Sequence, residues 1–218
     1  MRIYKKHCYG FTFIELIISS AVSVITIASL ISFFGNSISN NVDTLKQIHL
    51  NQQLRVLIDV MARDIRRAGY WSLADGYKPN PFMNGSAALT ISDDKTCITY
   101  SYDNNSGDPN IVQKKDKFGF RLLKDSIKFR QNSASCDKTK NWITMSENEN
   151  IKINNLNLVI SSNCKFLQDP KANCHIDDNI SKSISHTISI QINGELAHDS
   201  NIKQDMTRTV VIRNSTII

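Results

Sequence analysis

Charge and proline are both missing from a long stretch near the start of this chain. Of its 218 residues, 26 are Lys or Arg and 20 are Asp or Glu, yet residues 16–42 contain no charged residue and no proline. A disordered chain is excluded, because 41% of the residues are hydrophobic and only 21% are charged. The 27 uncharged positions are therefore predicted to form one helix without a proline kink.

Cysteine and catalytic motifs are also scarce. The five Cys are too few for a small disulfide-rich scaffold, and no CxxC pair supports a zinc ribbon. The sequence has no GxSxG, HExxH, GxxxxGKS/T or GxGxxG motif, and its five His are scattered. A metal site would have to use Cys174, His175, Asp177 and Asp178, whose spacing matches no standard zinc or calcium ligand set. We therefore expect no enzymatic activity, no cofactor and no metal.

Basic charge is concentrated at the very start of the chain. Arg2, Lys5 and Lys6 supply half of the formal net charge of +6, and the first ten residues contain no acid. As a helix, residues 11–35 would extend roughly 37 Å, which is enough to cross a hydrocarbon core of about 30 Å. The basic flank is expected to stay in the cytoplasm, with the remaining chain outside.

Two simpler explanations of this segment fit less well. A cleaved secretory signal peptide has an apolar region of about 7–15 residues and a small-residue cleavage site, whereas this apolar run is longer and no AxA motif ends it. A plain membrane anchor does not account for Glu15, because a carboxylate within a membrane span costs about 2.5–3.5 kcal/mol on insertion scales. Glu15 is therefore predicted to have a function.

The segment GFTFIEL, residues 10–16, resembles the class III signal of type IV pilins and of type II secretion pseudopilins. In that family a short basic leader precedes the Gly, and a membrane-embedded prepilin peptidase cuts after the Gly and methylates the new N-terminal Phe. The resemblance implies cleavage between Gly10 and Phe11, an N-methylated Phe11, and a leader peptide of residues 1–10. Phe13 stands where Leu is commoner in the family.

The processed end would give Glu15 a role in assembly. Cleavage creates an α-amine on Phe11, which is mostly cationic at neutral pH. Glu15 of the same or a neighbouring subunit can pair with this amine, and an unpaired charge is costly in a low dielectric. We expect the pair to select the register in which helices stack into a filament. Small residues along the span favour close helix packing, although their hydroxyls can instead bond to the preceding turn.

From residue 43 the sequence becomes amphipathic, which extends the predicted helix to about residue 68. Charged residues occupy much of one face, where Asp59 and Arg63 form a favourable i,i+4 pair, and Gly69 is predicted to end the helix. Residues 54–71, which include MARDIRRAGY, resemble the minor pilins of the PilW type, as does the ending TRTVVIRN. The apolar residues of the other face recur at helical spacing: Leu50, Leu54, Leu57, Ile58, Met61, Ile65 and Ala68.

After residue 70 the pattern changes to the alternation that is typical of strands. Asn-rich turns are expected between the strands, including Asn154 and Asn155 and the loop after Asp103, and residues 76–85 are expected to form a loop. The predicted strands are residues 96–102, 118–122, 127–131, 142–145, 156–161, 186–193 and 207–213.

The predicted fold is α+β, with an antiparallel sheet packed on the outer half of one long helix, as in pilins. Its expected parts are the leader (1–10), the transmembrane half of the helix (11–35), the periplasmic amphipathic half (36–69) and a β-rich globular domain (70–218).

The cysteines divide between the leader and the exported domain. Cys8 lies in the predicted leader, which leaves four. Three pairings of Cys97, Cys136, Cys164 and Cys174 are possible, and reduced core thiols are the alternative for the last two. We predict the disulfides Cys97–Cys136 and Cys164–Cys174, because an even number of cysteines in an oxidising compartment favours disulfides.

The resemblance implies a minor pilin that primes the assembly of a type IV pilus together with other minor pilins. Its expected partners are the prepilin peptidase, other minor pilins, the major pilin and an inner-membrane assembly platform. The protein is expected in the inner membrane, as a single-pass protein with its C-terminal domain in the periplasm, and then in the pilus filament at the cell surface. The alternative is a J-like pseudopilin of a type II secretion system, which shares the signal and the size.

A second alternative is a tip module that binds DNA or a surface. The arginines among residues 55–67 are interrupted by Asp59 and Asp64, so a solvated helix face is the expected arrangement. The strand region contains a second set of basic residues, Lys114, Lys115, Lys117, Lys124, Lys128 and Arg130. Asp116 and Asp125 lower the net positive charge of this set. Nucleic-acid binding is therefore not the main prediction.

Overall fold

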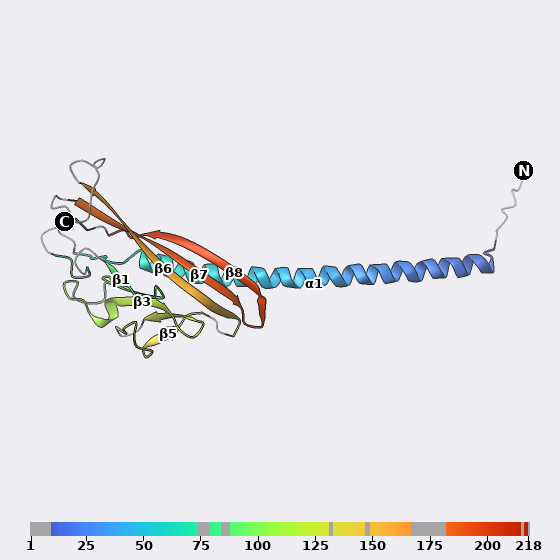
Figure 1. The fold of residues 1–218 in the computed structure, drawn as a ribbon, viewed down its shortest axis with the longest axis horizontal. Helices are drawn as coiled ribbons and strands as arrows, with labels where there is room; N and C mark the ends of the chain where they lie inside the picture. The colour runs from blue at the N-terminus through green and yellow to red at the C-terminus, as the bar shows by residue number, and fades with distance from the viewer. Residues whose placement is uncertain are drawn as a thin grey trace, which may run out of the picture. The chain divides into compact units, whose positions relative to one another are not determined.

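The computed structural model describes residues 10–73, 79–83, 88–130, 133–146, 149–166, 182–214 and 216–217. It has the predicted α+β class, with one long N-terminal helix, α1 (Phe13–Ile65), and antiparallel sheets packed on it (Figure 1). The chain divides into two compact units, Met1–Leu45 and Lys46–Ile218. The first contains the uncharged part of α1, and the second contains the remaining turns of α1 and all the strands.

Helix α1 ends slightly earlier than the predicted end at about residue 68. Its last helical residue is Ile65, and the chain continues in turns to Gly69, whose φ of 72° lies in the left-handed region. The Gly69 N–H donates to the carbonyl of Ser101 at 2.8 Å, which ties the helix end to the first sheet. A Cβ atom at this position would lie 2.6 Å from Met83 Sδ, so both the backbone angle and the close packing require glycine.

The first sheet is a five-stranded antiparallel meander. Its strands follow one another in chain order, each paired with the next. They are β1 (Leu89–Ile91), β2 (Cys97–Ser101), β3 (Lys117–Leu122), β4 (Ile127–Arg130) and β5 (Trp142–Thr144), and the short 3-10 helix η1 (Lys114–Asp116) precedes β3.

The second sheet is built from three long strands, β6 (Ile151–Phe166), β7 (Lys182–Leu196) and β8 (Asp199–Val211). The short strand β9 (Thr216–Ile217) pairs with the start of β7. In β7 every second residue from Ile184 to Leu196 is buried, which is the alternation expected of a strand with one face on the core.

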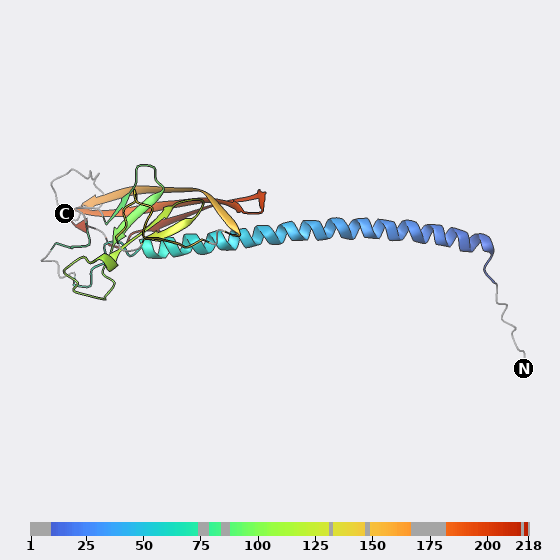
Figure 2. The ribbon, with the colours of Figure 1, turned by 90° about the horizontal axis from the view of Figure 1, so that it is seen from below.

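Both sheets contribute to one core around the last turns of α1. The predicted apolar stripe of the helix, from Leu50 to Ala68, is buried in this core. Figures 1 and 2 show the long strands β6 to β8 passing over this part of the helix. From the strands the core receives mainly Ile and Leu side chains, among them Ile98, Ile127, Ile153, Leu156, Ile190 and Ile192.

The expectation of a single sheet was wrong. Alternation identifies strands but does not say which strands pair, and here the chain changes sheets between β5 and β6. Isolated backbone hydrogen bonds join the sheets, such as the one from Ile153 N–H to the Asp125 carbonyl at 2.9 Å. Two strands, β1 and β9, were not predicted.

The predicted turn at Asn154 and Asn155 was also wrong. Strand β6 runs through both residues, and its register against β7 shifts between Ile153 and Asn155. A β-bulge absorbs the extra residue there, so the two Asn mark an irregularity within a strand rather than its end. Part of the loop predicted for residues 76–85 lies outside the described residues.

The disulfide predicted between Cys97 and Cys136 is confirmed. Both cysteines pack with Ala134 and Trp142 in a small cluster apart from the main core. The second predicted disulfide involves Cys174, which lies outside the described residues together with His175, Asp177 and Asp178, and that pairing stays a prediction.

Candidate functional site

The predicted processing segment directly precedes α1. Gly10 and Phe11 are exposed and non-helical, and the Phe11 side chain is 90% exposed. The leader before Gly10 lies outside the described residues. An exposed peptide bond outside regular structure is accessible to a peptidase, and cleavage between Gly10 and Phe11 stays a prediction.

Glu15 is held by Thr12 in a reciprocal cap at the start of α1. The backbone N–H and the hydroxyl of Thr12 both donate to Glu15 Oε2 at 2.8 Å, and the Glu15 N–H donates to Thr12 Oγ1 at 3.4 Å. This capping box satisfies N–H groups that a helix N-terminus otherwise leaves without partners. The T-x-x-E spacing of residues 12–15 is its signal in the sequence, and the prediction above missed it. Pairing of Glu15 with the α-amine of Phe11 stays a prediction.

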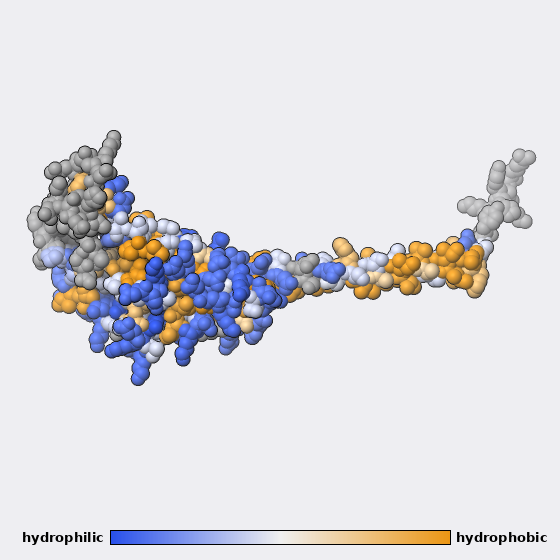
Figure 3. Space-filling view, in the orientation of Figure 1, coloured by the Kyte–Doolittle hydropathy of each residue, from blue (hydrophilic) through white to orange (hydrophobic). Residues whose placement is uncertain are grey.

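On the face seen in Figure 3, the first part of α1 is largely apolar. All its large apolar side chains up to Val42 are exposed, from 45% for Ile17 to 79% for Phe13. A helix with such a surface is stable in a membrane or against other apolar helices. Within the described ranges, α1 is the one helix long and apolar enough to cross a membrane.

Hydroxyl groups in this segment bond to the helix itself. Each donates to a backbone carbonyl three or four residues earlier, over distances of 2.7 to 3.1 Å, as Ser19, Ser20, Ser23, Thr26, Ser29 and Ser32 all do. Such bonds remove the need for water around the hydroxyls, which suits a membrane. Contacts of these small residues with helices of neighbouring subunits stay a prediction.

In the second unit, two tyrosines of the first sheet bind a carboxylate of α1. The hydroxyl of Tyr100 donates to Asp64 Oδ2 at 2.5 Å, and that of Tyr102 donates to Asp64 Oδ1 at 2.8 Å. Burial and the nearby Asp64 charge raise the pKa of Tyr100, so its phenol stays protonated and keeps donating. The guanidinium of Arg67 lies 4.2 Å above the Tyr102 ring.

We expect Tyr100→Phe to lower the free energy of unfolding by about 1.5–3 kcal/mol, because it removes a hydrogen bond to a charged group and leaves Asp64 Oδ2 without its donor. Urea unfolding of the full chain in detergent measures the change. The control is Tyr70→Phe, since within the described part of the chain the Tyr70 hydroxyl makes no hydrogen bond. Equal effects of the two substitutions would contradict this role of Asp64.

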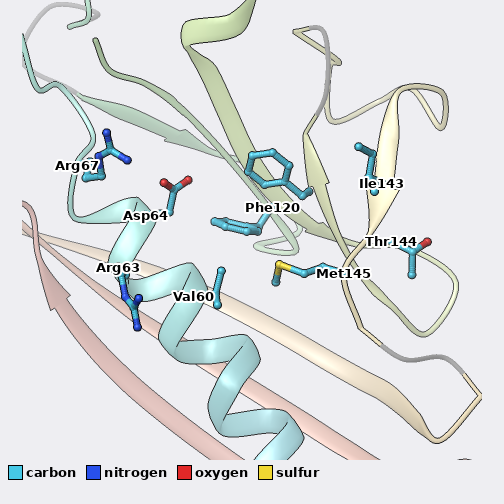
Figure 4. A pocket seen from close by; sticks show the side chains of 9 residues that line it. Val60, Arg63, Asp64, Arg67, Phe120, Ile143, Thr144 and Met145 are labelled. Carbon is cyan, nitrogen blue, oxygen red and sulfur yellow. The ribbon is translucent and has the colours of Figure 1, made fainter. Parts of the chain in front are cut away.

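A pocket of about 500 Å³ lies beside Asp64, between α1 and the first sheet (Figure 4). Arg63 and Arg67 lie on the helix side of this pocket. Its apolar lining comes from Val60, Phe120, Phe129, Ile143 and Met145. Because the tyrosines already bind Asp64, the pocket presents an apolar surface with basic groups on one side.

Two of the basic residues predicted in the strand region bind groups of the chain itself. Arg130 donates from Nε to the Ala134 carbonyl at 2.6 Å and from Nη1 to the Phe118 carbonyl at 3.2 Å. Lys128 donates to the Thr144 hydroxyl at 2.8 Å. These two side chains therefore hold neighbouring strands and loops together. Among the described residues, no group of three or more His, Cys, Asp or Glu is placed to hold a metal ion.

The exposed Gly10–Phe11 bond, the capped apolar helix and the antiparallel sheets on its polar end together define a pilin-like protein. The chain belongs to the family described as prepilin peptidase-dependent protein B, whose model matches residues 43–212. This match begins after residues 10–16, so it is independent of the processing motif. No curated protein and no solved structure matches the chain.

Proposed function

We propose that this protein is a minor pilin of the PilW type, which is assembled into a type IV pilus and primes its assembly. The observation that carries the proposal is the combination of an accessible Gly10–Phe11 bond with a helix whose apolar side chains are all exposed up to Val42. Membership of a prepilin peptidase-dependent family supports processing at this bond. The function requires no catalytic residue, because subunits would associate by helix packing.

The proposed partners follow from the two units. The prepilin peptidase would cut after Gly10 and methylate Phe11, and the apolar part of α1 would then pack against the helices of other minor pilins and of the major pilin. Before assembly the protein would reside in the inner membrane, with the folded domain in the periplasm, and would contact the assembly platform there. Afterwards it would be part of the filament at the cell surface.

We expect mass spectrometry of the mature protein to find N-methylated Phe11 as its first residue. A Gly10→Val substitution, which changes the residue on the N-terminal side of the cut, should leave the leader attached, while Gly35→Val should be processed normally. A mature protein that begins near residue 40, or that keeps Met1, would contradict the proposal.

The role of Glu15 in assembly can be separated from its capping role. Glu15→Gln keeps a side chain that completes the capping box but removes the charge, whereas Thr12→Ala removes the cap and keeps the charge. We expect Glu15→Gln to reduce the protein in sheared filaments about tenfold or more, because the α-amine of Phe11 then has no counter-charge in a low dielectric. Thr12→Ala should reduce it much less.

Equal amounts of both variants in the inner membrane are the control for insertion. Normal assembly of Glu15→Gln would contradict charge pairing. Absence of the wild-type protein from sheared pili, together with a secretion defect on its deletion, would favour the pseudopilin alternative.

A further inference from the structure

A second pocket, of about 450 Å³, lies beside the last turn of α1 and is lined by arginines. Arg63, Arg66 and Arg67 come from the helix end and Arg213 from the segment after β8. The other described lining residues are Tyr70, Asn105 and Asn214, so the described part of the lining contains four arginines and no carboxylate. We call this the arginine pocket.

Acids near the arginine pocket are bound elsewhere. The sequence places Asp59 and Asp64 between the arginines, where each is expected to weaken the positive charge. In the structure Asp59 instead lies 3.2 Å from Arg208 Nη1, and Asp64 accepts hydrogen bonds from Tyr100 and Tyr102. Within the described part of the chain, none of the four arginines lies within ion-pair distance of a carboxylate.

The helix end does not use these arginines as caps either. The amide of Asn214 donates to the carbonyls of Arg67 and Ala68, at 3.4 and 2.8 Å, and so satisfies acceptors in the turns that follow α1. By contrast, Arg66 Nε is buried and has no hydrogen-bond partner in the described structure. A buried donor without an acceptor is costly, so a ligand that supplies an acceptor to Arg66 Nε would remove this cost.

We propose that the arginine pocket binds a phosphate group. Arginine forks match the oxygens of a phosphate in pairs, and a phosphate offers more acceptors and more charge than a carboxylate does. Tyr70 and Asn105, which also line the pocket, have side chains with neutral donor groups. The group belongs either to a soluble phosphate ester or to the backbone of a nucleic acid. This site does not depend on the proposed role in a pilus.

The test uses the full chain in a non-ionic detergent and two probes, inorganic phosphate and a fluorescent single-stranded oligonucleotide. We expect the oligonucleotide to bind saturably at about 50 mM salt, with a log–log salt slope of about 0.7 per phosphate contact. The double variant Arg66→Gln/Arg213→Gln should weaken binding about tenfold and flatten the slope, because it removes charge-assisted hydrogen bonds. If inorganic phosphate displaces the oligonucleotide when its concentration equals that of the oligonucleotide's phosphate groups, the site is assigned to soluble esters. Its failure to compete assigns the site to the polymer backbone.

The matched control is Arg55→Gln, which removes the same charge from an exposed position on the same helix, outside the arginine pocket. It should leave the affinity unchanged. Arg213→Gln alone changes an exposed residue outside the strands, so it keeps the test valid if the double variant unfolds. The proposal is overturned if the wild type binds neither probe at low salt, or if Arg55→Gln weakens binding as much as Arg213→Gln does.

Discussion

Replacing both Cys97 and Cys136 with Ser is expected to lower the free energy of unfolding by about 4 kcal/mol. The two cysteines are 39 residues apart, and in the chain-entropy model a cross-link that closes a loop of this length removes about that much conformational freedom from the unfolded chain. Urea unfolding of the full chain in detergent measures the loss, and treatment of the wild type with a reductant should reproduce it.

The position of this disulfide explains where the effect should appear first. The bond joins the start of β2 to the segment that leads into β5, an edge strand of only three residues. The cluster around it is small. The Arg121 guanidinium also supports it, since it lies 5.3 Å from the Trp142 ring and donates to the Lys138 carbonyl at 2.8 Å. Without the cross-link, residues 133–146 should become sensitive to limited proteolysis before the core does. A change in stability below about 1 kcal/mol would contradict the entropic account.

The parts of the fold that could be predicted depend on local patterns. The stripe from Leu50 to Ala68 was predicted because helical spacing identifies a buried face whatever covers it. Gly69 was predicted because a helix end that needs positive φ favours glycine. The capping box of Thr12 and Glu15 was equally local, and could have been predicted from the T-x-x-E spacing.

The parts that could not be predicted depend on contacts between distant segments. Asp59 was paired with Arg63 on the basis of helical spacing, but it binds Arg208, which β8 brings to the helix. Asp64 was assigned to a solvated face, but Tyr100 and Tyr102 reach it from 36 and 38 residues away. In the sequence these acids alternate with the arginines and suggest that the positive charge is neutralised. The structure binds both acids elsewhere, so the charge of the arginine pocket could not be predicted from the sequence.

Leu54 of α1 packs closely against Gly194 of β7, and substitution of these two residues is the second prediction with a large effect. Leu54 is fully buried, and a Cβ atom added to Gly194 would lie 2.9 Å from Leu54 Cδ2 and 3.2 Å from the Lys152 carbonyl oxygen. The absence of a side chain at residue 194 therefore provides the space that the leucine fills. We expect Leu54→Ala to cost about 2–5 kcal/mol through lost burial and a cavity, and Gly194→Ala to cost about 1–3 kcal/mol through overpacking.

Combining the two substitutions should cost at least about 1 kcal/mol less than the sum of the single effects, because the new methyl group then occupies part of the space that the leucine has vacated. Urea unfolding of the four proteins in detergent gives this coupling energy. The control for the helix is Val56→Ala, which shortens a side chain that is 60% exposed and should change stability by less than about 0.5 kcal/mol. Additive costs would show that the leucine and the glycine do not share one space, and that the contact of α1 with β7 is looser than the close approach at Gly194 indicates.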